Sequence, residues 1–189
     1  PAPDAVDDGF GADEDTAGVV GNAITNNDSD PDGDLLSAIA QSNVAGSNGG
    51  LFSIASNGDV SFDPNGSFED LAAGETRTTS FAYTLVDADG ATDTATTTVT
   101  VTGVNDTPVT IGTIGTQTHN DSDTIAPIDV TGFFDDPDSS DVLTYSATGL
   151  PPGLSIDPNT GILSGTIGSS ASAGGPYSVQ ITANDGNGG

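Results

Sequence analysis

The fold is decided by two alternating runs, Phe81-Ala82-Tyr83-Thr84-Leu85 and Thr96-Thr97-Thr98-Val99-Thr100-Val101, on either side of the turn signal Asp87-Ala88-Asp89-Gly90. In both runs residues of different polarity alternate with a period of two, and the residue types favour strands. The Asp and Gly residues between the runs are typical of a turn. This stretch therefore predicts two β-strands separated by a turn.

The same period of two occurs on both sides of this stretch. It is found in Val60–Phe62, Leu143–Ala147 and Tyr177–Thr182, and turn signals such as Asp157–Gly161 separate the runs. No segment shows a convincing period of 3.6 residues, apart from a short turn at Asp70–Ala73. Short strands with frequent turns predict an all-β sandwich.

The composition excludes several classes of function. The 189 residues include 28 Asp plus Glu but no lysine and one arginine, Arg77, so the formal net charge is −27 with the single histidine neutral. Such a chain cannot neutralise phosphates, which excludes nucleic-acid binding, and an anionic membrane surface would repel it. The absence of cysteine excludes disulfides, thiol catalysis and zinc–thiolate sites. No apolar run approaches the roughly 18 residues of a membrane span.

Low hydrophobicity and high charge would also suit a disordered chain, since the hydrophobic fraction of 33% lies below the globular average of about 45–50%. The ordered alternation of residues argues against disorder. The chain begins with Pro1 and has no signal-like segment, so we expect it to be part of a longer polypeptide.

An internal repeat divides the chain. Three acidic landmarks recur in the same order at offsets of 106, 108 and 98 residues. They pair Asp30–Asp32 with Asp136–Asp138, Asp13–Thr16 with Asp121–Thr124, and Asp87–Gly90 with Asp185–Gly188. The repeat predicts two tandem sandwich domains, residues 1–104 and 105–189, joined near Gly103–Pro108.

The two copies differ in completeness. After its landmark turn the first copy has a final strand, Ala95–Thr102, whereas the second ends without one. We therefore expect the second sandwich to lack its last strand. Its sheet edge would be open, or filled by a neighbouring chain or by further sequence.

Clustered acids indicate a cation site. Single aspartates are ordinary turn residues, but the clusters Asp28–Asp34 and Asp135–Asp138 place like charges side by side. Hard divalent cations need six to eight oxygen ligands, which favours calcium over the stricter magnesium. An EF-hand is rejected, because Ile39 stands where its twelfth-position Glu should be and because strands flank the loop.

The first domain resembles the bacterial VCBS and cadherin-like tandem repeat. The matching stretches are Ala5–Asp8, Asp13–Thr16, Asn27–Asp34, Phe68–Thr76, Tyr83–Gly90 and Val101–Val109. The second domain resembles a dystroglycan-type cadherin-like or Ig-like repeat. Its matching stretches are Phe134–Asp138, Leu143–Ala147, Gly149–Asp157, Thr160–Gly161 and Leu163–Thr166. The resemblance implies two Greek-key immunoglobulin/cadherin-like β-sandwiches.

The resemblance also implies a calcium site at the junction of the domains, with seven ligands. They are Asn105 and Asp106 in the linker, Asp136 and Asp138 in the D-x-D motif of the second domain, Asp185 after its penultimate strand, and Glu14 and Glu75 at the base of the first domain. At the far end of the first domain it implies a second set, consisting of Asp30, Asp32, Asp87 and Asp89.

Two departures from the family pattern qualify these sites. Pro1–Pro3 stands where an Asn-Asp linker would precede the far set, so that site is expected to be incomplete and weaker than in an intact protein. In the second domain Ser122 replaces the counterpart of Glu14, and Gly168–Gly175 offers no acid that matches Glu75. We therefore expect no calcium-stiffened junction below the second domain.

Such repeats build large secreted adhesins, so the resemblance implies a non-catalytic calcium-binding extender or adhesion module outside the cell or on a bacterial surface. Calcium would stiffen the interdomain junction. The expected partners are neighbouring repeats of the same polypeptide, and polysaccharide or cell-surface ligands.

The alternative function is a carbohydrate-binding module of a secreted polysaccharide-acting protein. Sugar platforms usually need exposed aromatic faces, yet Trp is absent and Tyr83, Tyr145 and Tyr177 lie in strand patterns. Adjacent strand residues point to opposite faces, so one of Phe133 and Phe134 could be exposed. Catalysis ranks third: a Ser-His-Asp relay would depend on His119 alone, in a polar stretch. The many acids leave a carboxylate pair for glycoside hydrolysis open on composition, but the sequence shows no cleft or aromatic subsite for it. We expect no enzyme.

Overall fold

The alternating stretch that decides the fold forms the longest pair of strands. In the computed structural model, β7 (Thr76–Val86) pairs antiparallel with β8 (Thr92–Thr102) along their full lengths. At the turn between them, the Asp87 carboxylate accepts the backbone N–H groups of Asp89 and Ala91 at 3.0 and 2.8 Å. The two strands and the turn that the sequence predicts are confirmed.

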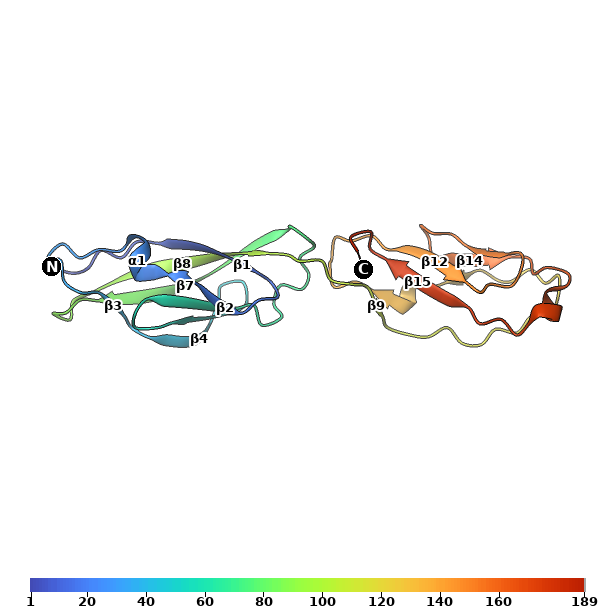
Figure 1. The fold of residues 1–189 in the computed structure, drawn as a ribbon, viewed down its shortest axis with the longest axis horizontal. Helices are drawn as coiled ribbons and strands as arrows, with labels where there is room; N and C mark the ends of the chain where they lie inside the picture. The colour runs from blue at the N-terminus through green and yellow to red at the C-terminus, as the bar shows by residue number, and fades with distance from the viewer. Residues whose placement is uncertain (189) are drawn as a thin grey trace. The chain divides into compact units, whose positions relative to one another are not determined.

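The structure describes residues 1–188, which form two compact units, one ending at Val104 and the other beginning at Asn105 (Figure 1). The other elements of the first unit are β1 (Asp8–Asp13), β2 (Gly18–Asn22), α1 (Ala23–Asn27), β3 (Ser37–Ala38), β4 (Gln41–Ala45), β5 (Leu51–Ile54) and β6 (Asp59–Asp63). One sheet has the strand order β1-β8-β7-β3 and the other the order β2-β6-β5-β4. β1 runs parallel to β8, so β8 lies between β1 and β7.

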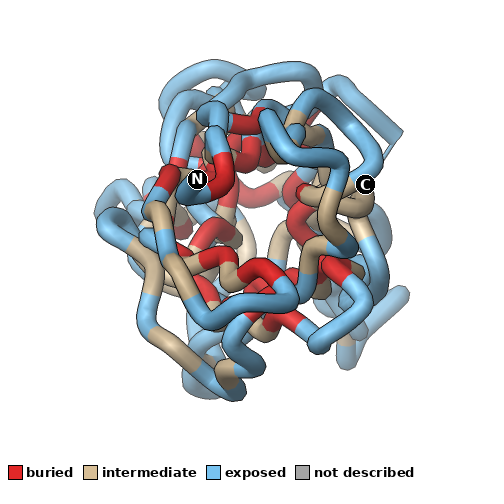
Figure 2. The backbone as a smooth tube through the Cα atoms, turned by 90° about the vertical axis from the view of Figure 1, so that its left-hand side faces the viewer, coloured by how far each residue is buried: buried red, intermediate tan, exposed pale blue. Residues whose placement is uncertain are grey.

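Alternating side chains of both sheets build the core of the first unit. Phe81 and Tyr83 point inward from β7, and Val99 points inward from β8. The fully buried ring of Phe52 lies 4.7 Å from the ring of Phe81 and 4.9 Å from that of Phe62, measured between centroids. Figure 2 shows buried segments on the inside and exposed segments on the outside. Aromatic contacts of this kind contribute beyond their buried area.

The second unit is built from shorter elements. They are β9 (Val109–Thr110), β10 (Ile128–Asp129), the 3-10 turn η1 (Thr131–Phe133), β11 (Phe134–Asp135), β12 (Thr144–Thr148), β13 (Leu154–Ile156), β14 (Ile162–Gly165), the 3-10 turn η2 (Ala171–Gly174) and β15 (Gln180–Asn184). Its sheets have the orders β10-β14-β13, β12-β15 and β11-β9. The prediction of an all-β fold is confirmed in both units.

Two local features differ from the sequence-based expectation. Helix α1 was not predicted, because its five residues are too short to show a helical period; the Asn22 side chain caps it by accepting the N–H of Thr25 at 2.9 Å. The strand expected over Tyr177–Thr182 begins only at Gln180, because the partner strand β12 pairs no residue before it.

The second unit has no described counterpart of β8. Between Asn105 and residue 188, β15 pairs with β12 alone, and residues 111–120 form no strand. Among the described helices, none is long and apolar enough to cross a membrane.

Candidate metal sites

In the second unit, loops that follow three different strands bring predicted ligands together. The backbone N–H of Asp106 donates to Asp138 Oδ2 at 3.0 Å, and the Asn105 side-chain amide donates to Asp185 Oδ2 at 3.0 Å. The N–H of Asp138 donates to Asp136 Oδ1, also at 3.0 Å. All five ligands that the sequence predicted in this unit therefore belong to one cluster.

Asp141 is a member of this cluster that the sequence analysis missed. Carboxylate oxygens of Asp136, Asp141 and Asp185 all lie within 4.8 Å of one another. The sequence does carry a signal: Asp141 closes the acidic loop that starts with Asp136, just as Asp34 closes the loop that starts with Asp30. Both closing acids precede an apolar residue. The repeat comparison could thus have found Asp141.

Several oxygens of this cluster are buried without a hydrogen-bond partner in the described structure. They are Asp136 Oδ2, Asp138 Oδ1 and Asn105 Oδ1, and the Asp138 residue is only 1% exposed. Leaving a buried acceptor unsatisfied costs about 1–3 kcal/mol, and more for a charged group. Oxygen-rich, anionic and under-coordinated, this donor set fits a hard divalent cation.

The electrostatics of the cluster also favour a bound cation. Burial, followed by repulsion from neighbouring carboxylates, raises the pKa of both Asp136 and Asp138 above the ordinary aspartate value. The charged forms of the two side chains are therefore disfavoured as long as no cation compensates them.

At the Val104 end of the first unit lie the two predicted glutamates. Glu14 directly follows β1, is 3% exposed, and accepts the N–H of Val104 through Oε1 at 2.7 Å. Glu75 is exposed and accepts the N–H of Ala72 through Oε2 at 3.3 Å. Its backbone carbonyl accepts the N–H of Gly103 at 2.8 Å. The chain just before Asn105 is thus bonded to both glutamates.

Gly103 permits this arrangement, and replacing it with alanine should disturb it. A Cβ at Gly103 would lie 2.3 Å from the carbonyl oxygen of Ala72 and 2.4 Å from that of Leu71. Because both neighbours are backbone atoms, they cannot move aside as a flexible side chain would. We expect Gly103→Ala to destabilise the first unit by about 1–3 kcal/mol, measured by calorimetry of the whole chain. Gly66→Ala would not test packing, because alanine is strained at the φ of 64° that glycine adopts freely at this position.

Gly9 offers the matched control. A Cβ added at Gly9, in β1, would meet no heavy atom within 4 Å. Gly9→Ala should therefore leave the melting temperature almost unchanged. Equal destabilisation by Gly9→Ala and Gly103→Ala would contradict the assigned close approach.

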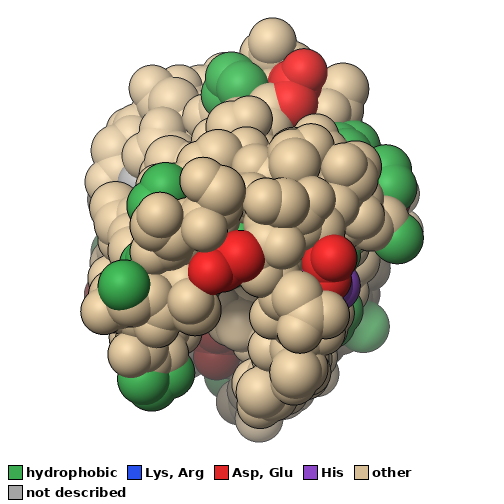
Figure 3. Space-filling model, turned by 90° about the vertical axis from the view of Figure 1, so that its right-hand side faces the viewer, with side chains coloured by type: hydrophobic (Ala, Val, Ile, Leu, Met, Phe, Trp, Pro, Cys, Tyr) green, Lys and Arg blue, Asp and Glu red, His purple; other side chains and the backbone are tan. Residues whose placement is uncertain are grey.

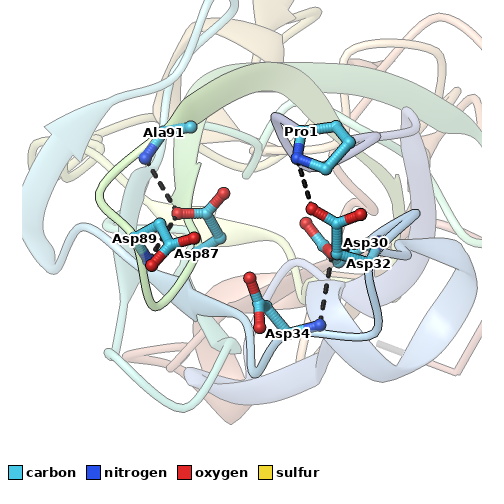
Figure 4. A network of polar contacts seen from close by, with 7 residues as sticks. All are labelled: Pro1, Asp30, Asp32, Asp34, Asp87, Asp89 and Ala91. Atoms are coloured by element: carbon cyan, nitrogen blue, oxygen red, sulfur yellow. Dashed lines mark hydrogen bonds and ion pairs between the residues drawn. The ribbon is translucent and has the colours of Figure 1, made fainter.

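A second acidic cluster lies at the other end of the first unit, where the β7–β8 turn meets the loop that contains Asp30, Asp32 and Asp34 (Figure 4). Asp30 Oδ1 accepts the backbone N–H groups of Asp32 and Asp34 at 2.7 and 3.2 Å, and oxygens of these three carboxylates lie within 4.8 Å of one another. Figure 4 shows the carboxylate of Asp87 directed toward the same space. The exposed Asp89 continues the Asp87 loop.

This cluster also contains buried oxygens without hydrogen-bond partners among the described residues, Asp30 Oδ2 and Asp87 Oδ2. Asp87 is 6% exposed. The terminal amine of Pro1 forms an ion pair with Asp32 at 2.5 Å. The donor set fits a hard cation here too.

The only arginine of the sequence, which contains no lysine, belongs to neither cluster. Arg77 forms a bidentate pair with Asp70, at 3.0 and 2.6 Å, and its guanidinium lies 5.8 Å from the centroid of the Phe68 ring. The clustered carboxylates consequently have no Lys or Arg side chain to neutralise them.

The η2 end of the second unit is different. Figure 3 shows acidic side chains scattered over this face rather than gathered. Asp121 there accepts the N–H and the hydroxyl of Ser172 at 2.8 and 2.7 Å, and these bonds lower the pKa of Asp121. No group of three clustered acids involves this end of the described chain.

The tyrosines are engaged in the fold. Tyr83 is 1% exposed and Tyr145 8%, so their rings are buried in the cores, as the strand pattern predicts. Tyr177 is half-buried and donates its hydroxyl to the carbonyl of Ala171 at 2.8 Å. Phe133 and Phe134 are both half-buried. His119, on which a catalytic relay would depend, is exposed.

Comparison with known proteins gives two family matches. The model of the family described as "Bacterial cadherin-like domain" matches residues 1–103, and that of the family described as "Putative Ig domain" matches residues 107–189. No curated protein matches the chain in sequence.

Solved structures with similar folds are cadherin ectodomains. Mouse cadherin-23 EC22-24 is 17% identical with a TM-score of 0.63, over 98% of this chain and 60% of that chain. Drosophila N-cadherin EC1-4 is 15% identical with a TM-score of 0.56, over 97% of this chain and 45% of that one. Protocadherin Gamma B2 domains 1-5 are 16% identical with a TM-score of 0.59, over 97% of this chain and 36% of that one. This chain thus spans less than two thirds of each, and the likeness confirms the cadherin/Ig-like fold class.

Proposed function

Because the chain belongs to the bacterial cadherin-like domain family, whose model matches residues 1–103, we propose that it is a non-catalytic calcium-binding extender or adhesion module of a larger secreted or surface-anchored bacterial protein. One observation carries the calcium part of the proposal: the buried, partnerless oxygens of Asn105, Asp136 and Asp138 within a ring of further carboxylates. A cluster that served only as a turn would have its buried oxygens satisfied by its own backbone.

The proposed ligands of the junction site come from both units. Asn105, Asp106, Asp136, Asp138 and Asp185 would form one half, with Asp141 beside them, and Glu14 and Glu75 the other half. Bound calcium would supply two positive charges and six to eight coordination positions for oxygen. With their repulsion compensated, the carboxylates could hold the linker in one geometry, so that a flexible connection becomes stiff.

The far cluster of the first unit would hold calcium in the same way. Asp30, Asp32, Asp87 and Asp89 are its proposed ligands, with Asp34 as an addition from the structure. Repetition of such sites along a polypeptide would place neighbouring repeats as the immediate partners of this chain. Polysaccharide or cell-surface ligands are proposed as partners of the larger protein.

The proposed setting is extracellular. Calcium sites in extracellular modules typically have dissociation constants of roughly 10⁻⁴ to 10⁻³ M, which suits external fluids rather than cytosol. At an excess of about 100-fold over Kd, each ion bound only by the folded state adds about 2.7 kcal/mol to the free energy of unfolding. The sites would therefore respond to external calcium in both stability and stiffness.

Small-angle X-ray scattering tests this proposal on the whole chain, first with calcium at millimolar concentration and then with chelator. We expect the maximum dimension to be sharply defined with calcium and the scattering to become that of a flexible two-part particle after chelation. Magnesium at the same ionic strength controls for charge screening, because it coordinates with stricter geometry. Identical scattering curves with calcium and with chelator would exclude the stiffening mechanism.

A further inference from the structure

Four asparagines of the chain are followed directly by glycine, a pair that can modify itself without an enzyme. The pairs are Asn48-Gly49, Asn57-Gly58, Asn65-Gly66 and Asn187-Gly188. Once the backbone nitrogen of the glycine has lost its proton, it can attack the side-chain carbon Cγ of the asparagine and close a cyclic imide. Glycine favours this intramolecular reaction because it has no side chain and its backbone rotates freely. The reaction requires an unbonded glycine N–H and a side-chain amide that is free to turn.

In three of the pairs a hydrogen bond holds the glycine N–H. The acceptors are the carbonyl of Gly46 for Gly49 at 3.3 Å, the carbonyl of Ala55 for Gly58 at 2.9 Å, and Asp185 Oδ1 for Gly188 at 3.2 Å. Each bond must break before the nitrogen can lose its proton and act as a nucleophile, which lowers the rate.

The asparagine side chain is held in the same three pairs. Its amide group donates to the carbonyl of Thr78 from Asn48 at 2.8 Å, to Asp59 Oδ2 from Asn57 at 2.8 Å, and to Asp141 Oδ2 from Asn187 at 2.9 Å. These bonds fix the direction of Cγ. The three pairs are therefore restrained at both reacting groups.

Asn65-Gly66 lacks both restraints. Within residues 1–188, no hydrogen bond holds the Asn65 side chain or the N–H of Gly66; only the backbone N–H of Asn65 is bonded, to Asp63 Oδ1 at 2.9 Å. Both residues of the pair are exposed, and a Cβ added at Gly66 would meet no heavy atom within 4 Å. The space at Gly188 is equally open, so the absence of hydrogen bonds distinguishes Asn65-Gly66.

The fold requires these two residue types at this place. Asn65 and Gly66 are the central residues of the turn after β6, which the N–H of Ser67 closes by donating to the carbonyl of Pro64 at 3.0 Å. Their φ angles are 51° and 64°, in the left-handed region that Asn and Gly tolerate best. The residues that suit the turn are thus also the residues that can react with each other.

We propose that Asn65 is a site of spontaneous deamidation, at which the folded protein converts asparagine into aspartate and isoaspartate with water as the co-reactant. The Gly66 nitrogen gives its proton to solvent and bonds to Asn65 Cγ, while the bond from Cγ to Nδ2 breaks and ammonia leaves. Water then adds to one of the two imide carbonyl carbons and breaks its bond to the nitrogen. Opening at Cγ gives aspartate, and opening at the backbone carbonyl gives isoaspartate, whose main chain runs through the former side chain. This reaction is independent of the proposed calcium binding.

Peptide mapping of the whole folded chain tests the proposal, after incubation at mildly alkaline pH in water enriched in oxygen-18. The heavy oxygen marks carboxylates that form during the incubation. A protease that cleaves after aromatic residues releases residues 63–68, because Phe62 and Phe68 flank them. By mass spectrometry we expect Asn65 to deamidate about tenfold faster or more than each of the other three sites, since two hydrogen bonds restrain each of those.

The same incubation in urea is the control for local sequence. Unfolding removes the hydrogen bonds that distinguish the four pairs, so their rates should converge. In the folded chain, equal or faster reaction at Asn48, Asn57 or Asn187 overturns the proposal. A preference for Asn65 that is as large in urea as in the folded chain would assign the reactivity to neighbouring residue types and overturn it as well.

Asn65→Gly is the matched variant. Glycine suits the positive φ of this position but has no Cγ to attack. Each conversion at Asn65 adds one negative charge, so the parent chain should develop a more acidic species on anion exchange during incubation. That early species should be missing from Asn65→Gly, and its appearance at the parental rate would contradict the assignment.

Discussion

Replacing Asp136 and Asp138 together with asparagine is expected to abolish most of the calcium-dependent rise in melting temperature of the second unit. Asparagine keeps the size and one acceptor oxygen of each side chain but removes the negative charge that a hard cation requires. Loss of one ion at about 100-fold excess over Kd removes about 2.7 kcal/mol, or about 10–20 °C for a unit of this size. Calorimetry with calcium and with chelator measures the difference.

The same double variant should melt at a higher temperature than the parent when chelator is present. Burial and neighbouring carboxylates raise the pKa of both side chains, which shows that their charged forms are disfavoured without a cation. Neutral asparagine removes that penalty. The variant is therefore predicted to gain stability in chelator and to lose the response to calcium, and a purely structural role of the two aspartates would give a loss under both conditions.

Asp129→Asn combined with Asp157→Asn is the matched control. Both aspartates lie in the second unit and accept turn hydrogen bonds, from Thr131 and Asn159, that an asparagine oxygen can also accept. The control removes the same amount of charge from outside the cluster. A calcium response reduced equally by both double variants would indicate general charge effects and contradict a localised site.

The calcium response should also weaken at acid pH. In chelator the raised pKa values mean that the folded state binds protons more tightly than the unfolded state. The contribution of Asp136 and Asp138 to stability is therefore greatest below the ordinary value of 3.8 and is lost as the pH rises through the raised values. Calcium needs the deprotonated ligands, so its stabilising effect should shrink as the pH falls through the same range. Calorimetric melting with calcium and with chelator, repeated across this pH range, tests whether the stabilising effect of calcium shrinks as the pH falls.

Phe52→Ala is expected to have the other large effect, a loss of about 3–5 kcal/mol in the first unit. The Phe52 ring is fully buried and contacts the ring of Phe62 from its own sheet and the ring of Phe81 from the opposite sheet. Truncation removes apolar burial and leaves a cavity that the surrounding strands cannot close. A domain has a total stability of only about 5–15 kcal/mol, so the variant should lose much of it.

Urea unfolding followed by circular dichroism measures this loss on the whole chain, with Val19→Ala as the control. Val19 is 66% exposed, and its truncation should change the free energy of unfolding by less than about 0.5 kcal/mol. Calcium should not rescue Phe52→Ala to the parent value, because its core defect is present with or without the ion. A loss of less than about 1 kcal/mol would contradict the core position of this ring.

Much of the first unit could be predicted from local pattern. The period of two in Phe81–Leu85 and Thr96–Val101 specified both the strands and their inward faces, since side chains alternate across a pleated strand. Helix α1 was missed because a five-residue helix depends on its Asn22 cap and not on periodicity. The late start of β15 at Gln180 was missed because the length of a strand depends on its partner, which lies far away in the sequence.

The metal ligands were predicted from residue type and family resemblance, and as a calcium site they remain a prediction. The sequence showed Asp136 and Asp138 as an acidic pair, but it did not show that Asp141 and Asp185, 44 residues apart, bring carboxylate oxygens within 4.8 Å of each other. Nor did the sequence show which side-chain oxygens of the cluster are buried without a hydrogen-bond partner. Hydrogen bonding depends on how loops from separate strands approach one another.

The sequence by itself determined the all-β architecture, the acidic character and the repeat, because alternation, charge and spacing are properties of neighbouring residues. Only the tertiary structure decided which of the many carboxylates are buried together and which Asn-Gly pair keeps its side-chain amide and its glycine N–H without hydrogen bonds. The physical reason is that the burial of a side chain and its hydrogen bonds depend on contacts between segments that are distant in the chain. Their free energies depend on three-dimensional packing, which no local pattern encodes.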